Sequence, residues 1–425
     1  MTFKIITLGC KVNLYESEIM QEKLLSNAFT LTNDDFSDII IINTCSVTNV
    51  ADNKSKKLIR SARRDNKDAI IVVCGCMAQN KQEEIKDLGI DILIGNKDKS
   101  KIVELLREYL NNKEPIIRFY NAKRLEFEDM QVDKFKSHTR AFMKIQDGCN
   151  NYCTYCIIPY VRGSIRSKDF ASAIEEAKIL TKNGHKEIVL TGINTGAYGK
   201  EFGHDLVDLI TEISKIESLE KIRISSIEIT EINEKFLHML ETNSKVCNHL
   251  HIPLQSGSEK ILKLMGRKYT KKEFLDKIDK IREIRKDINI TTDVIVGFPS
   301  ETEKDFKECL EFCELLKFGK IHVFPYSKRE GTKAAEMKEQ LDNGLKKERA
   351  RTLIALSDKM EEEYNKKFIN QKLSVLIETN KEGISTGLTS NYLKVLISDN
   401  LEVNRRYEVL IKEAAKDYVR GFVKE

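Results

Sequence analysis

The chain has 425 residues, of which 41% are hydrophobic and 32% charged, and its formal net charge is +5. This length suits two or three domains with a sizeable core, and no stretch approaches the ~20 apolar residues of a membrane span. The mild positive charge permits a nucleic-acid partner without indicating one.

The N-terminus and the cysteine content indicate where the protein works. Residues 1–6 read directly as a strand and lack the apolar core of a signal peptide, so we expect a cytoplasmic protein. Ten cysteines in that reducing compartment point to metal ligands or catalysis rather than to disulfides.

Residues 1–113 alternate short β-branched runs with polar helical stretches, which predicts a parallel sheet covered by helices. The predicted strands are 3–8, 38–42 and 69–73. One cysteine follows each strand: Cys10, Cys45 and Cys76. Because the carboxyl ends of parallel strands face one crevice, we expect these thiols to converge on a metal cluster. Cys74 competes with Cys76, but inside its strand it is expected to behave as a small buried hydrophobe.

The helix expected after Cys45 carries basic residues, most of them on one face: Lys56, Arg60, Arg63, Arg64 and Lys67. Such a face is either solvated or a strip that contacts phosphate groups beside the crevice. Arg60 and Arg64 are the candidate RNA contacts.

A charged connector, 114–137, leads into a region, 138–366, in which six predicted strands alternate with helices. The strands are 141–146, 187–191, 221–226, 249–254, 289–296 and 320–325, and the helices include 170–182, 232–240 and 304–316. Six such units favour an open partial barrel over a closed eight-fold one, with the functional loops at the carboxyl ends of the strands.

Three cysteines lie within eight residues after the first barrel strand: Cys149, Cys153 and Cys156. This spacing lets one short loop surround a cuboidal iron–sulfur cluster, which takes thiolate ligands. No histidine has the tight spacing to this trio that a four-ligand structural zinc site shows. Three protein ligands would leave one iron open for a substrate or cofactor.

Other polar residues lie at or just beyond the ends of barrel strands: Thr191, Gly192, Ser226, Glu228, Gln255, Asp293 and Arg329. The glycine-rich stretch 191–196 lets the backbone approach a ligand closely, or is a plain tight turn. The carboxylates and Arg329 are candidates for ligand contacts or for ordinary salt bridges. His249 and His251 point to one face of a strand and are expected in barrel packing or substrate contact.

Residues 368–425 predict a small β-barrel. Its expected strands are 373–378, 392–397 and 407–411, with breaks at Gly383, Gly387 and 399–404. The segment is almost neutral, so its charge does not identify it as a nucleic-acid binder.

The spacing of Cys149, Cys153 and Cys156, with the aromatic Tyr155 before the last cysteine, resembles the radical S-adenosylmethionine (SAM) superfamily. The resemblance implies that the open iron chelates SAM and that the reduced cluster cleaves it to a 5′-deoxyadenosyl radical. With Cys10, Cys45 and Cys76 added, the whole chain resembles the methylthiotransferases. In that family an N-terminal cluster domain (1–113) and a linker (114–137) precede a radical SAM core (138–366) and a TRAM domain (368–425).

Short sequence motifs distinguish the branches of that family. Residues 7–18, which include Gly9-Cys10-Lys11-Val12-Asn13, resemble the branch that acts on N6-threonylcarbamoyladenosine at tRNA position 37. The isopentenyladenosine branch usually has Gly-Cys-Gln-Met-Asn, and the ribosomal-protein branch Gly-Cys-Pro-Lys-Asn. Residues 43–52 and 144–149 favour the same branch.

The resemblance implies methylthiolation of adenine C2 in the tRNA anticodon loop, with two [4Fe-4S] clusters held by the two cysteine trios and SAM used twice. It places Tyr155, Thr191, Gly192, Ser226, Glu228 and Asp293 near SAM, and Arg60, Arg64, Gln255 and Arg329 near the substrate. The sulfur donor and the electron donor are not indicated. Alternatives are isopentenyladenosine in tRNA, a ribosomal-protein aspartate, or a non-catalytic iron–sulfur protein with an RNA-binding tail.

Overall fold

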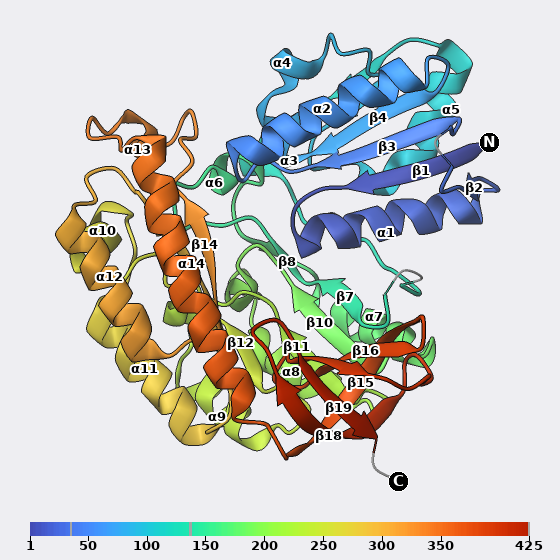
Figure 1. Cartoon of the computed structure of the whole chain (residues 1–425). Helices are drawn as coiled ribbons and strands as arrows, with labels where there is room; N and C mark the ends of the chain where they lie inside the picture. The colour runs from blue at the N-terminus through green and yellow to red at the C-terminus, as the bar shows by residue number, and fades with distance from the viewer. Residues whose placement is uncertain (35, 136–137, 424–425) are drawn as a thin grey trace.

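A computed structural model describes residues 1–34, 36–135 and 138–423. Figure 1 shows three parts: an N-terminal sheet in blue, a central set of strands and helices in green to orange, and a small C-terminal barrel in red. None of the helices in the described ranges combines the length and apolar character needed to cross a bilayer.

The N-terminal sheet has six parallel strands in the order β2-β1-β3-β4-β5-β6. They are β1 (Thr2–Thr7), β2 (Thr30–Leu31), β3 (Ile39–Thr44), β4 (Ile70–Gly75), β5 (Ile92–Ile94) and β6 (Ile116–Arg118). Strands β3 and β4 are buried along their whole length, as expected for a parallel sheet covered on both faces. Strand β6 lies within the segment predicted as a connector and pairs with β5.

Helices cover both faces of this sheet: α1 (Lys11–Ser26), α2 (Asn49–Asp65), α3 (Cys76–Asn80), α4 (Gln82–Ile85) and α5 (Ile102–Asn112). Helices α1 and α5 pack on one face, and α2 and α3 on the other. Short 3-10 turns lie at Lys99–Lys101 and Ala122–Arg124.

The central part contains the six predicted strands: β7 (Ala141–Lys144), β10 (Glu187–Thr191), β11 (Lys221–Ile224), β12 (His249–His251), β13 (Asn289–Val296) and β14 (Lys320–Pro325). They form two parallel three-stranded sheets, β11-β10-β7 and β12-β13-β14, joined by isolated bridges between Ile222 and Val246 and between Ser226 and His251. A hairpin of β8 (Gln146–Asp147) and β9 (Arg166–Ser167) follows β7. The result is the predicted open, six-stranded barrel.

Helices α7 (Phe170–Lys182), α8 (Leu206–Ile213), α9 (Glu234–Thr242), α10 (Glu259–Leu264), α11 (Lys271–Ile284) and α12 (Glu303–Leu316) connect these strands. Also present are α6 (Ile158–Val161), α13 (Lys333–Glu336), the long α14 (Asn343–Lys366) and 3-10 turns at Thr195–Ala197 and Ile229–Glu231. Cys309 and Cys313 are buried in α12.

The C-terminal barrel is closed in the order β15-β16-β17-β19-β18. Its strands are β15 (Lys372–Lys381), β16 (Ile384–Thr389), β17 (Lys394–Ile397), β18 (Arg406–Ala414) and β19 (Val419–Val423). Gly387 does not break a strand, contrary to the sequence prediction, because it pairs inside β16 with Ile377 and Val395. A β-carbon there would lie 2.4 Å from the Leu376 carbonyl oxygen, so glycine permits the close approach of two strands.

The turn between β16 and β17 docks on the amino-terminal end of the central strands. The Tyr392 ring stacks on His249 with 4.7 Å between centroids, and the Arg223 guanidinium lies 4.7 Å from the Tyr392 ring centroid. Arg223 also donates to the Thr389 and Ser390 carbonyls at 3.2 and 3.1 Å. The carboxyl ends of the central strands therefore remain available for a ligand.

Candidate functional site

The structure brings the ends of β1, β3 and β4 together, and with them Cys10, Cys45 and Cys76. Cys10 precedes α1, Cys45 directly follows β3, and Cys76 begins α3. These strands are neighbours in the sheet, so the cysteines lie at one edge, as the strand pattern predicts. Gly9 has a φ of +98°, and a β-carbon there would lie 2.7 Å from that of Cys45. Only glycine allows the turns before Cys10 and after β3 to approach so closely.

Asn13 holds this edge in place. Its side-chain amide donates to the Leu8 carbonyl at 2.7 Å and to the Thr44 carbonyl at 2.9 Å. The residue is buried, so both contacts are shielded from water. One side chain thus joins the chain segments that lead into Cys10 and Cys45.

Cys74 lies apart from this convergence. It is fully buried within β4 and packs in the apolar cluster beneath α1 and α5, with neighbours that include Ile41 and Val72. The prediction that it lies in its strand as a small buried hydrophobe is confirmed.

The second cysteine trio lies on the loop after β8. Cys149, Cys153 and Cys156 are all partly exposed. Cys156 donates its backbone N–H to the Cys153 carbonyl at 3.0 Å, which curls the loop. Gly148, with a φ of +72°, passes so close to the Ser164 carbonyl that a β-carbon would overlap it. The loop therefore has a fixed entry and a tight turn.

A cavity of about 190 Å³ lies between the two trios. Val47 and Thr48, which follow Cys45, contribute to its lining from the N-terminal sheet. Tyr155 and Cys156 line it from the cysteine loop. The cavity thus extends from Cys156 of the second trio to the segment that directly follows Cys45 of the first.

Three predicted site residues line this cavity: Tyr155, Gln255 and Asp293. The Asp293 carboxylate lies 3.2 Å from Nε2 of His251, which fixes its direction. His251 and His249 both contact the Thr291 hydroxyl, at 2.9 and 3.0 Å. Thr291 thus holds both histidines, and His251 in turn orients the Asp293 carboxylate at the cavity wall.

The other predicted strand-end residues differ in how directly they approach the cysteine loop. Thr191 is buried at the end of β10, and a β-carbon on Gly192 would lie 2.8 Å from Oε1 of Gln146, so this loop rests on β8. Ser226 forms the bridge that links the two central sheets. Glu228 pairs with Arg267, whose Nη1 donates to the Cys153 sulfur at 3.3 Å.

The arginines predicted to contact the substrate lie in different surroundings in the structure. Arg60 and Arg64 are exposed on α2, and Arg64 pairs with its neighbour Asp65 at 2.7 Å. Arg329 is instead 4% exposed and makes an ion pair with Asp52 at 2.7 Å and a hydrogen bond with Ser46 at 2.9 Å. Its guanidinium therefore joins the central part to the segment after Cys45.

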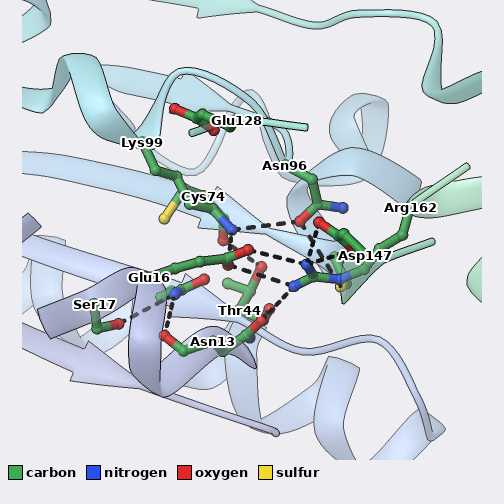
Figure 2. Close-up of polar contacts among 12 residues, drawn as sticks. Asn13, Glu16, Ser17, Thr44, Cys74, Asn96, Lys99, Glu128, Asp147 and Arg162 are labelled. Carbon is green, nitrogen blue, oxygen red and sulfur yellow. Dashed lines mark hydrogen bonds and ion pairs between the residues drawn. The ribbon is translucent and has the colours of Figure 1, made fainter. Parts of the chain in front are cut away.

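Sequence reasoning missed a buried charged network beside Cys76, drawn in Figure 2. Arg162 is fully buried at the end of α6, and its Nε donates to the Cys76 sulfur at 3.2 Å. It also bonds to Glu16 and Asp147, at 3.0 and 3.2 Å. These partners are 146 and 15 residues away along the chain. No local pattern marks such pairs, and Glu16 lies on a helix with no clear apolar stripe.

Both trios consist of cysteines alone, and thiolates are the ligands that iron–sulfur clusters take. In the described part of the chain, no three His, Cys, Asp or Glu side chains are close enough to hold one metal ion. A cuboidal cluster spreads its thiolates over separate irons, so wider spacing is expected. Burial raises the pKa of Cys45 to about 11 and that of Cys156 to about 12. Metal coordination is what keeps such thiols deprotonated at neutral pH.

Comparisons with known proteins identify the family. Residues 143–313 match the radical SAM superfamily, and residues 2–95 match the uncharacterized protein family UPF0004. The fold is similar to that of TsrM, a radical SAM methyltransferase from Kitasatospora setae solved with cobalamin and a [4Fe-4S] cluster. The TM-score is 0.58, the sequences are 13% identical, and 79% of this chain and 73% of that chain are covered. The fold and site thus define a radical SAM protein with an additional N-terminal cysteine-bearing sheet.

Curated relatives name the family. The chain is 41% identical to the threonylcarbamoyladenosine tRNA methylthiotransferase MtaB of Bacillus subtilis, covering 98% of this chain and 94% of that protein. It is 38% identical to the MtaB of Aquifex aeolicus, covering 95% and 98%. It is 36% identical to the tRNA-2-methylthio-N(6)-dimethylallyladenosine synthase of Acetivibrio thermocellus, covering 88% and 79%. The chain therefore belongs to the radical SAM methylthiotransferase family, whose enzymes use SAM and two [4Fe-4S] clusters.

Proposed function

We propose that the protein methylthiolates C2 of adenine in N6-threonylcarbamoyladenosine at position 37 of tRNA, acting on the anticodon loop in the cytoplasm. The observation that carries this proposal is the similarity, over nearly the whole chain, to two relatives named for that nucleoside. The sequence of residues 7–18 supports the same branch.

Each cysteine trio has a role in this proposal. Cys10, Cys45 and Cys76 hold one cluster at the edge of the N-terminal sheet, and Cys149, Cys153 and Cys156 hold the other on the loop after β8. When bound, the clusters and SAM supply the radical and methylthio chemistry, which side-chain acid–base groups cannot provide at an adenine C–H bond.

The protein positions the reactants and excludes water. The cavity between the trios has a wall that is mostly apolar, including Ile157, Ile295 and Phe324, with Gln255 and Asp293 among its polar groups. Such a lining favours a flat base over water, and the polar groups orient it. Glu228 reaches the cysteine loop through Arg267. We assign contacts to SAM to Tyr155, Thr191, Gly192, Ser226, Glu228 and Asp293.

Mass spectrometry of nucleosides from bulk tRNA tests the proposal, with cells that carry the gene compared with cells that lack it. We expect selective loss of 2-methylthio-N6-threonylcarbamoyladenosine from the deleted strain. Loss of the isopentenyl analogue alone would instead assign the substrate of the dimethylallyladenosine relatives. No change in either nucleoside would overturn the tRNA assignment and direct attention to the ribosomal-protein aspartate or a non-catalytic role.

A second assay tests the chemistry directly. Deuterium placed on adenine C2 of the tRNA substrate should appear in 5′-deoxyadenosine when purified enzyme turns over. Absence of transfer, with methylthio product still formed, would refute hydrogen removal from C2 by the radical.

A further inference from the structure

The side chain of Arg162 occupies a sealed position between the N-terminal sheet and the central barrel. Besides the Cys76 sulfur, it donates to Asn13 Oδ1 at 2.7 Å and to the carboxylates of Glu16 and Asp147 (Figure 2). Asn13 is the residue that joins the turns leading into Cys10 and Cys45. The guanidinium is therefore held by several partners and cannot turn away from the sulfur without breaking buried bonds.

The ion pairs around Arg162 carry more positive than negative charge. Four cations take part: Lys99, Lys144, Arg162 and Arg166. Their carboxylate partners are Glu16 and Asp147, and all six residues are at most 9% exposed. Buried charge is costly unless it is compensated. A thiolate-bound cluster at Cys76 supplies negative charge at the point to which Arg162 donates.

The second trio has a matching arginine. Arg267 Nη1 donates to the Cys153 sulfur at 3.3 Å, Arg267 pairs with Glu228, and its guanidinium lies 5.0 Å from the Tyr269 ring centroid. Each trio thus has one largely enclosed arginine that donates to one cysteine sulfur and is balanced by at least one carboxylate. The two arginines come from different elements, so each is placed independently.

We propose that Arg162 is a positioning residue that raises the reduction potential of the cluster held by Cys10, Cys45 and Cys76, and that Arg267 does the same for the other cluster. The inference rests on the cluster assignment in the proposed function. A one-electron reduction adds negative charge to a cluster, and a charged donor at a ligand sulfur stabilises that reduced state. The potential of each cluster is therefore set separately, by its own arginine.

The test is a redox titration, followed by electron paramagnetic resonance, on full-length protein reconstituted anaerobically with iron and sulfide. Each cluster is observed alone, in variants that lack the other cysteine trio. Arg162→Gln should lower the potential of the N-terminal cluster and leave that of the second cluster unchanged. Arg267→Gln should do the reverse, so each variant is the control for the other.

Arg166→Gln tests whether the hydrogen bond to the Cys76 sulfur, rather than nearby positive charge alone, sets the reduction potential. Arg166 pairs with Asp147 at 2.9 Å in the same network, and it donates to Asp147 and to the Arg162 and Ser164 carbonyls rather than to Cys76. We expect it to shift the N-terminal potential less than Arg162→Gln does. Equal shifts from the two variants, or no shift from Arg162→Gln, would overturn the proposal.

Arg162→Lys covers the case in which the glutamine variant does not fold. It keeps the charge but loses the planar fork, so we expect a folded protein with a smaller decrease in potential. An unchanged potential in that variant would also count against the hydrogen bond. A wild-type protein that takes up iron at only one trio would instead contradict the cluster assignment, and iron analysis distinguishes that failure from an absent shift in potential.

Discussion

At the scale of single residues, the three strand-end cysteines differ from Cys74 in surroundings rather than in distance along the chain. Cys76 begins a helix at the crevice edge and receives a hydrogen bond from Arg162, whereas Cys74, two residues earlier, is packed among aliphatic side chains. In a continuous strand, residues two apart would point to the same face, but the turn at Gly75, with a φ of +100°, redirects the chain so that Cys76 begins a helix. A core cysteine and a proposed ligand cysteine can therefore follow each other closely in sequence.

Alanine at Cys10, Cys45 or Cys76 should halve the iron content of the reconstituted protein, because one cluster loses a ligand while the other trio is untouched. Cys74→Ala is the matched control and should retain full iron, since its side chain is buried within β4 in the apolar cluster rather than at the crevice edge. Iron and sulfide analysis after anaerobic reconstitution gives the answer. Full iron in all three ligand variants, or loss in the Cys74 variant alone, would contradict the assignment.

Glu16 offers a residue-level test of the buried network. Burial opposes its ionisation, but Arg162, Lys144 and Lys99 together hold its pKa below the usual range. A carboxyl group with a lowered pKa contributes stability above its unfolded pKa and loses it as the pH falls through the folded value. We therefore expect the melting temperature of the wild-type apoprotein to fall more on acidification below pH ~5 than that of the Glu16→Gln variant.

At neutral pH the same substitution leaves Lys99 without its carboxylate partner and leaves Lys144 and Arg162 paired with Asp147 alone. Removing one partner of a buried ion pair costs about 3–5 kcal/mol. Glu16→Gln should therefore lower the melting temperature of the apoprotein at pH 7. Parallel acid dependence of the two proteins, with equal melting temperatures at pH 7, would show that Glu16 carries no stabilising charge.

At the scale of elements, sequence patterns identified long β-branched runs and missed short or irregular strands. All six central strands were predicted because runs such as 289–296 are rich in β-branched residues over enough length to be distinctive. Strand β6 is three residues long within a charged segment, and β16 contains Gly387, so neither has the usual pattern. The buried network of Arg162 was missed because its partners meet only after the two parts pack together.

Gly387 and Gly383 allow an element-level comparison within one hairpin. A β-carbon on Gly387 would overlap the Leu376 carbonyl, whereas on Gly383 it would meet no atom within 4 Å and only a φ of +77° opposes it. Gly383→Ala should cost about 1 kcal/mol from that strain, and Gly387→Ala should cost more because two strands must separate. Thermal unfolding of the two variants tests the order, and an equal or reversed order would contradict the close strand approach.

At the scale of the whole molecule, the three parts are connected by specific buried contacts rather than by the linker alone. Arg329 joins the central part to the segment after Cys45, and Tyr392 joins the C-terminal barrel to the amino ends of the central strands. The cavity between the cysteine trios is formed by two of these parts together. Under the proposed function, we expect tRNA to approach on the side of α2, whose N-cap residue Thr48 lines the cavity.

Charge reversal at Arg60 and Arg64 should weaken tRNA binding, because both guanidinium groups are exposed on α2. Each lost phosphate contact should reduce the slope of log affinity against log salt by about 0.7–0.9. Lys307→Glu is the matched control: Lys307 is 75% exposed on α12, on the central part, and should leave the slope unchanged. Measuring the tRNA affinity of each variant from low to physiological salt gives these slopes. If the α2 variants and the control share the wild-type slope, α2 is a solvated face and RNA contacts lie elsewhere.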